Sequence, residues 1–239
     1  DTATTEIYTL SLHDALPISV GHLIISQAGR RMAIRSMSPV CSITIEQKEG
    51  TDMTKVDIFS GFLGAGKTTL IKKLVKEVFA GKKIVLIENE FGEIGIDGGF
   101  LKDAGINITE MNSGCICCSL VGDFGAALKK VLEDYTPDRI VIEPSGVGKL
   151  SDVIAAVERV QKEEPNLHLN SFVTVVDATK AKVYMKNFGE FFNNQVEHAC
   201  AILLSRTQKM DEGKLNAAVH LLREKNPKAA ILTTPSDQI

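Results

Sequence analysis

The sequence predicts an α/β fold in which a mostly parallel central sheet is covered by helices on both faces. From Lys55 onward, short apolar runs alternate with stretches whose apolar residues recur at helical spacing. This alternation is typical of β-α-β units, whose crossover helices cover both faces of a parallel sheet. Residues 60–69 contain one such junction: an apolar strand is followed by a glycine-rich turn and a helix.

The expected strands are short apolar runs at residues 55–60, 83–88, 106–110, 139–143, 170–177, 200–205 and 229–233. Helices are expected between them, and three apolar stripes at helical spacing support this. The stripes contain Leu120, Val121, Phe124, Leu128, Val131, Leu132 and Tyr135; Leu150, Val153, Ile154, Val157 and Val160; and Leu215, Ala218, Val219 and Leu222. We assign the stripes to the core and give them no chemistry.

The composition is that of a globular protein. The chain has 239 residues, of which 44% are hydrophobic and 24% charged, which allows one large or two small domains. A net charge of -3 argues against nucleic acid as a partner, and no apolar run approaches the roughly 18 residues of a membrane span. Three of the five cysteines lie within residues 115–118, which is no disulfide framework and favours a reducing compartment, the cytoplasm.

The first 52 residues are expected to be a non-native leader. Residues 1–18 resemble the in-frame translation of a short-read sequencing adapter, so they are excluded from fold reasoning. Residues 19–52 show no sustained period. The codons AAG-GAG-G for Lys48, Glu49 and Gly50 would spell a bacterial ribosome-binding sequence. We therefore expect translation to start at Met53 and the working domain to cover residues 53–239.

Residues 61–68 match the phosphate-binding pattern G-x-x-x-x-G-K-[ST] at every fixed position. Its glycines let backbone N–H groups approach phosphates closely, and the following helix N-terminus adds partial positive charge. Lys67 is expected to reach the β- and γ-phosphates, and the Thr68 hydroxyl to hold Mg²⁺. The expected phosphate-binding residues are Gly61, Gly64, Ala65, Gly66, Lys67, Thr68 and Thr69.

Two acidic segments follow the phosphate loop in the sequence. Glu90 and Glu93 lie in a glycine-rich stretch, residues 88–97, that fits a mobile switch segment near Mg²⁺ or the attacking water. A solvated acidic loop is the equal alternative. Glu143 ends a buried strand, and its carboxylate is expected to bind Mg²⁺ directly or through water, while the N–H of Gly146 is offered to a γ-phosphate. The alternative is a strand capped by a turn.

Cys115, Cys117 and Cys118 form a cluster that can converge on one soft cation. Thiolates bind Zn²⁺ and similar transition metals, and four ligands complete a tetrahedron. The fourth ligand would come from Glu90, Glu93, a water molecule or a partner. Buried or redox-active cysteines are the alternative.

Four motifs stand in order, SGFLGAGKTT, ENEFGEIGID, GCICC and IEPSG. Together they resemble the CobW-like family of GTPases, over about residues 53–239; Asp177 and Gln195 also match family positions. The resemblance implies a three-layer P-loop fold and a GTP-dependent metallochaperone. Such a protein holds Zn²⁺ or another transition metal at the cysteines, couples that site to hydrolysis, and serves a client metalloprotein. It leaves a homodimer open.

This chain departs from the family in its guanine-reading motif N-K-x-D, where it has Ser205, Arg206, Thr207 and Gln208. The family Asp accepts two hydrogen bonds from guanine, whereas an amide has one acceptor oxygen. Guanine preference should therefore fall, which leaves ATP as an alternative nucleotide, although Arg206 could still stack on the base. The chain also stops at Ile239, where family members usually carry a further C-terminal domain, so we expect either a truncated fragment, which the adapter-like start favours, or a minimal form.

The sequence therefore predicts a metal-responsive nucleotide hydrolase whose catalytic residues are Lys67, Thr68, Glu90 and Glu143. One alternative is a nucleotide-gated metal-binding scaffold with little turnover. Another is a P-loop ATPase or kinase that has lost guanine selectivity.

Overall fold

The computed structural model describes residues 53–88 and 123–235, and in addition the backbone of the strands at residues 22–26, 31–35, 42–44 and 108–112. All structural statements below concern these residues.

The described part of the chain contains a seven-stranded sheet whose paired strands are all parallel. Its order is β10-β9-β8-β4-β7-β5-β6, so the strand before the phosphate loop lies at the centre. The strands are β4 (Thr54–Ser60), β5 (Ile84–Glu88), β6 (Ile108–Asn112), β7 (Arg139–Glu143), β8 (Leu167–Asp177), β9 (Ala201–Ser205) and β10 (Ala230–Leu232). Each expected strand is confirmed, with ends shifted by a few residues.

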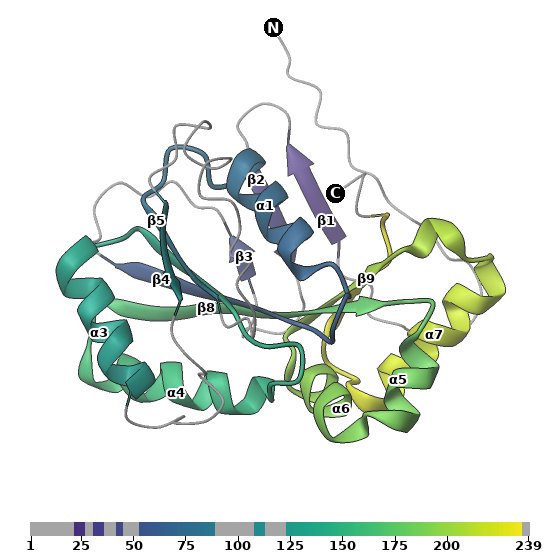
Figure 1. Cartoon of the computed structure of the whole chain (residues 1–239). Coiled ribbons are helices and arrows are strands. Elements are labelled where there is room, and N and C mark those ends of the chain that lie inside the picture. Colours follow the sequence, from purple (N-terminus) through teal and green to yellow (C-terminus); the bar gives the residue numbers. More distant parts are fainter. Residues whose placement is uncertain are drawn as a thin grey trace, which may run out of the picture.

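Helices cover both faces of this sheet, as predicted (Figure 1). The helix α1 lies on one face; the helices α3 to α7 lie on the other. The helices are α1 (Lys67–Glu77), α3 (Asp123–Tyr135), α4 (Leu150–Glu163), α5 (Ala181–Asn187), α6 (Gly189–His198) and α7 (Glu212–Lys225). A short 3-10 turn, η1 (Thr207–Lys209), precedes α7.

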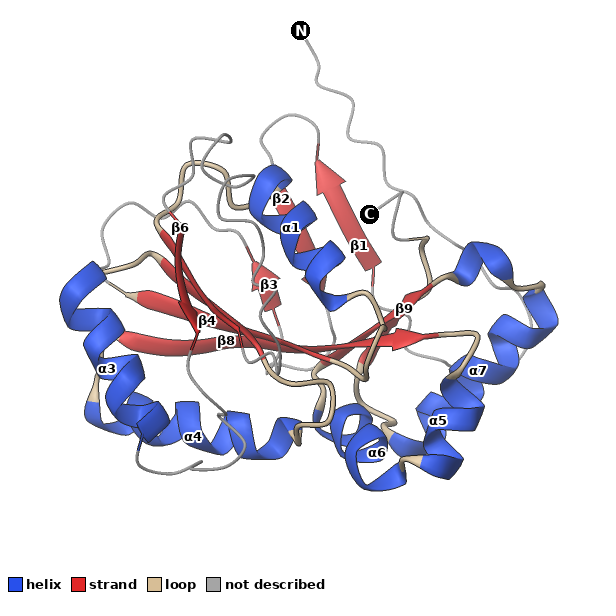
Figure 2. Cartoon of the chain, viewed as in Figure 1, coloured by secondary structure: helices blue, strands red, loops and turns tan. Residues whose placement is uncertain are grey.

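Alternate residues of the strands whose side chains are described supply the two hydrophobic cores. In β5, Ile84 and Leu86 pack with α1, whereas Val85 and Ile87 pack with α3 and α4. In β7, Val141 belongs to the α1 side and its neighbours to the other side. Because successive side chains of a strand point to opposite faces, a strand that is apolar throughout must be covered on both. Figure 2 shows the resulting twisted middle layer of strands.

Three strands were not expected from the sequence. They are β1 (His22–Ser26), β2 (Arg31–Arg35) and β3 (Ser42–Thr44), and they pair antiparallel in the order β1-β2-β3. They lie in residues 19–52, a stretch without a sustained apolar period in its sequence. The expectation of a non-native leader at residues 1–52 stays a prediction.

A buried polar network joins the three central strands. The Asp57 carboxylate on β4 forms an ion pair with Arg139 of β7 and accepts hydrogen bonds from Asn170 Nδ2 and Ser171 Oγ of β8, both at 2.6 Å. The pairing of β4 with β8 shifts register between Val56 and Asp57, beside this carboxylate. A buried charge costs several kcal/mol unless it is paired and hydrogen-bonded, and here it is both.

Two further findings bear on the composition. In the described residues, every helix is too short or too polar to span a bilayer.

Cys200 is disulfide-bonded, which differs from the expectation that the cysteines form no disulfides. Cysteine spacing along the chain does not report which thiols lie together in space, so this bond could not be predicted from the spacing.

Candidate functional site

The phosphate loop, residues 61–68, joins the central strand β4 to α1 in a conformation that requires glycine. Gly61 has a φ of +143°, and a Cβ there would lie 2.3 Å from the carbonyl oxygen of Val175 on β8. Gly64 has a φ of +69° but open space around its Cα. Gly66, at +103°, is the residue before the first helical turn. The loop is thus both tightly curved and pressed against the sheet.

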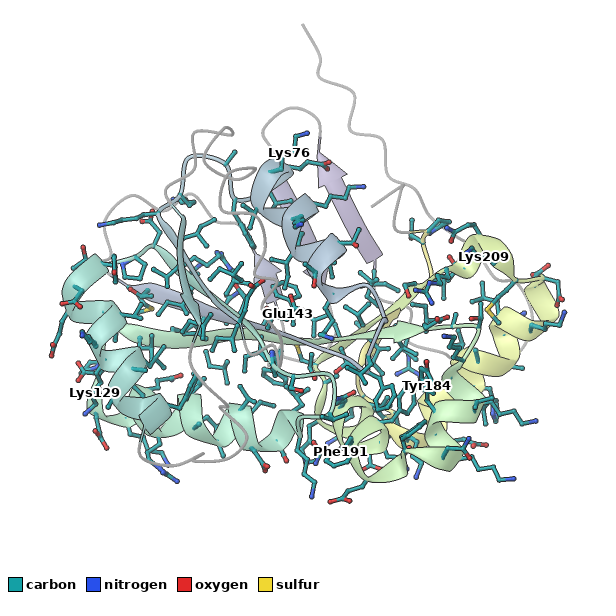
Figure 3. The ribbon with its side chains drawn as sticks, in the orientation of Figure 1. Lys76, Lys129, Glu143, Tyr184, Phe191 and Lys209 are labelled. Carbon is teal, nitrogen blue, oxygen red and sulfur yellow. The ribbon has the colours of Figure 1, made fainter. Side chains whose placement is uncertain are left out.

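Lys67 and Thr68 begin α1 and meet the carboxylate of Glu143, the last residue of β7. The Thr68 hydroxyl lies 3.0 and 3.2 Å from the two carboxylate oxygens, and the Lys67 Nζ lies 3.9 Å from the nearer one. Lys67 and Glu143 are buried, at 8% and 9% exposure. Figure 3 shows Glu143 inside the molecule, near the start of α1. The structure thereby brings three predicted site residues together from two distant segments.

Glu88 is a buried carboxylate that the sequence reasoning did not assign to the site. It ends β5 and stands directly opposite Glu143 in the parallel pairing of β5 with β7. The available signal was its position, because the carboxyl ends of parallel strands share one edge of the sheet, where α/β proteins bind ligands. Two acidic residues therefore lie side by side at this edge, next to the phosphate loop.

The loop that follows Glu143, residues 144–148, also touches the phosphate loop; we call it the β7–α4 loop. A Cβ on Gly146 would lie 2.8 Å from the backbone nitrogen of Leu63, so the two loops are in van der Waals contact. Gly146 is buried. Its predicted position beside the phosphates fits this contact, since the terminal phosphate would lie at the same edge.

Residues 205–208, which stand where the family has its guanine-reading motif, form hydrogen bonds to the phosphate loop. The Ser205 hydroxyl donates to the Ala65 carbonyl at 2.7 Å, and Arg206 Nη2 donates to the Gly64 carbonyl at 2.8 Å. The Arg206 guanidinium also pairs with Asp177 at the end of β8, and Arg206 has a φ of 60°. Gln208 is exposed. The guanidinium is thus held by protein groups, a role that the sequence did not indicate.

An aromatic cluster supports the other side of the phosphate loop. Phe62 lies with its ring centroid 4.7 Å from that of Tyr184 and 4.9 Å from that of Phe188, and Phe192 stands edge-on at 6.4 Å. Tyr184 lies on α5, and Phe192 on α6. Offset and tilted ring pairs at such distances stabilise a contact beyond the area they bury. The loop is therefore held from both flanks.

The predicted switch and metal residues, Glu90, Glu93, Cys115, Cys117 and Cys118, lie outside the described residues. Among the residues that are described, no group of three His, Cys, Asp or Glu side chains could hold a metal ion. The predicted transition-metal site therefore remains a prediction.

Comparison with known proteins identifies what this arrangement resembles. A family model described as the CobW/HypB/UreG nucleotide-binding domain matches residues 55–233. The zinc chaperone CobW of a Sinorhizobium species is 34% identical over 190 residues, which cover 67% of this chain and 52% of that protein. The zinc chaperone YjiA of Escherichia coli is 34% identical over 66% of this chain and 51% of that protein. The zinc-regulated GTPase metalloprotein activator 1 of Schizosaccharomyces pombe is 25% identical over 80% of this chain and 48% of that protein.

Solved structures agree with the fold. The Zn(II)-bound YjiA GTPase of E. coli has a TM-score of 0.55 and 27% identity, covering 75% of this chain and 57% of that one. The hydrogenase maturation factor HypB of Archaeoglobus fulgidus has a TM-score of 0.52 at 19% identity, covering 78% and 83%. This chain spans about half the length of the curated relatives described above.

The two glycines of the phosphate loop make a matched pair for a test. Gly64→Ala should destabilise the fold by about 1–2 kcal/mol, the cost of a left-handed backbone for a residue with a Cβ. Gly61→Ala should cost at least about twice as much, because its Cβ must also displace the Val175 carbonyl. Chemical denaturation of both variants measures the difference. Equal losses would show that the contact with Val175 is unimportant.

Proposed function

The chain belongs to the CobW/HypB/UreG family of nucleotide-binding domains, and on that premise we propose that it is a metal-responsive GTPase that acts as a metallochaperone or metalloenzyme activator. Relatives named as zinc chaperones and as a GTPase metalloprotein activator support the class of function. Because the chain spans about half of those proteins, the activity, the cargo and the client are part of the proposal.

One observation supports the proposal of nucleotide hydrolysis: Lys67, Thr68 and Glu143 meet beside the phosphate loop. A buried ammonium group next to backbone N–H groups fits the negative charge of a triphosphate. The Lys67 ammonium lies within 4 Å of the Glu143 carboxylate, which offsets part of its burial cost. Phosphates would replace that partner by a stronger one.

The same residues fit a hard cation. Mg²⁺ takes oxygen ligands, keeps several waters and is usually held by one or two protein oxygens together with phosphate oxygens. The Thr68 hydroxyl and the Glu143 carboxylate supply such oxygens within hydrogen-bonding distance of each other. When bound, Mg²⁺ would neutralise charge on the phosphates, while Lys67 and the loop amides orient them. Glu90 is proposed to position the attacking water.

The transition metal is proposed to bind at Cys115, Cys117 and Cys118, with Glu90 or Glu93 as a further ligand. The support is the thiolate chemistry and the zinc chaperones among the relatives. In this proposal the γ-phosphate orders residues 89–97, brings a glutamate towards the cysteines and so changes the metal affinity.

A second candidate, hydrolysis without guanine selectivity, is favoured by the segment at residues 205–208. The Ser205 and Arg206 side chains hold the phosphate loop, and neither contact depends on the base. Gln208 presents one acceptor and one donor group where two acceptors would read guanine. ATP is therefore the alternative nucleotide.

Hydrolysis should depend on the Lys67 ammonium and the Glu143 carboxylate. We expect Lys67→Ala and Glu143→Gln each to lower kcat/KM for GTP by about a hundredfold or more, as loss of one preorganised charge at a transition state does. Lys129→Ala, at a partly exposed lysine of α3 that pairs with Glu163 of α4, is the control and should leave turnover unchanged. Phosphate release assays on all four proteins measure this. Nucleotide binding without turnover in the wild type would favour the scaffold instead.

Metal binding should respond to the nucleotide. The Zn²⁺ affinity of the reduced protein is expected to differ at least about fivefold between GDP and a non-hydrolysable GTP analogue, the lower range of allosteric coupling. Cys117→Ser should lose most of the bound Zn²⁺ in both states, and Lys67→Ala should keep the Zn²⁺ but lose the difference. Competition with a chromophoric chelator reads out each affinity. Equal affinities in the wild type would remove the coupling.

Base selectivity should be restored by one carboxylate. Gln208→Asp is expected to raise the ratio of GTP to ATP affinity about tenfold, because two acceptors then face guanine's two donors. Lys209→Gln is the matched control, since it changes the net charge by the same amount at the next residue of η1 without adding a carboxylate. Competition titrations give the ratio for each variant. An unchanged ratio in Gln208→Asp would place base recognition elsewhere.

A further inference from the structure

Gln195, on the helix α6, holds the β7–α4 loop from inside the protein. Its side chain is completely buried, and its Nε2 donates to the carbonyls of Gly146 at 3.0 Å and of Gly148 at 2.9 Å. The two carbonyls flank Val147, so both hydrogens of the amide group are used on one turn of the loop. Because both partners are acceptors, the orientation of the amide is fixed.

The loop has few other anchors. Within residues 144–148, Gly148 N donates to Ser145 O at 2.8 Å and Val147 N donates to Ser145 Oγ at 3.4 Å. In the described part of the chain, Gln195 makes the hydrogen bonds that this loop receives from another element. Beyond its two chain ends and its contact with Leu63, the loop is therefore positioned by the Gln195 side chain.

Gln195 is itself held firmly. Its own carbonyl accepts a hydrogen bond from the buried Thr174 hydroxyl on β8 at 2.6 Å. On the same helix, Phe192 packs against Phe62 of the phosphate loop. The helix α6 is thus fixed to the sheet and to the phosphate loop, and Gln195 transmits that position to Gly146.

We propose that Gln195 is a positioning residue for the terminal phosphate of a bound nucleoside triphosphate. It holds the Gly146 carbonyl while Gly146 lies against Leu63 of the phosphate loop, where the backbone N–H of Gly146 would be available to the γ-phosphate. The α- and β-phosphates depend on the phosphate loop and not on this contact. Loss of the Gln195 amide therefore weakens triphosphate binding and hydrolysis selectively. This inference rests on the proposed function.

The test compares a diphosphate with a triphosphate. In Gln195→Leu, the Kd for a non-hydrolysable GTP analogue should rise about tenfold or more and kcat should fall by a similar factor, since two buried carbonyls lose their donor. The Kd for GDP should change less than about threefold. Asn194→Ala is the control, because it also removes two hydrogen bonds from α6 but does not touch the β7–α4 loop.

Gln195→Glu serves as a second variant of nearly the same shape. A carboxylate has no hydrogen for either carbonyl, whereas a protonated carboxyl group has one, so triphosphate preference should recover in part as the pH falls. The preference of Asn194→Ala should follow that of the wild type across the same pH range. The inference is overturned if folded Gln195 variants keep the wild-type ratio of the two affinities, or lose both affinities equally. A wild type that binds neither nucleotide refutes the proposed function, and the inference with it.

Discussion

The buried carboxylate of Glu143 is the constraint on which the site depends. A carboxylate at 9% exposure is tolerated only with a charged or hydrogen-bonding partner. Thr68 and Lys67, the first residues of α1, supply both kinds of partner. The contact fixes the start of α1 relative to the end of β7, although 75 residues separate Thr68 from Glu143. The same contact restrains the phosphate loop, which joins β4 to α1.

Most of the fold could be predicted because its signals are local. A run such as Ile140 to Ile142 is apolar on both faces and short, which predicts a strand of a covered parallel sheet. The phosphate loop is likewise a contiguous pattern, so Lys67 and Thr68 could be named in advance. Glu143 could be named because it ends a predicted strand. The strands β1 to β3 could not, since residues 19–52 show no sustained period and were interpreted as part of a leader.

The remaining parts of the site depend on contacts between distant segments, which one sequence does not reveal. Glu88 lies beside Glu143 because of the register of β5 against β7, and that register is set by packing across the whole sheet. The expectation that Arg206 stacks on the base stays a prediction, and the contacts of its guanidinium with Asp177 and the Gly64 carbonyl join segments that are far apart in the sequence. Gln195 matched a family position, but its hydrogen bonds to the carbonyls of Gly146 and Gly148 could not be read from the sequence.

The hydrogen bonds that hold the phosphate loop also determine when the loop can form during folding. The hydrogen bonds from Ser205 and Arg206 span 140 and 142 residues, so loop closure over most of the domain must precede them. On a ribosome that synthesises the N-terminus first, β4 and α1 emerge long before β9. The loop therefore reaches its ligand-ready shape late in folding, and nucleotide affinity becomes a measure of whether the chain has finished folding.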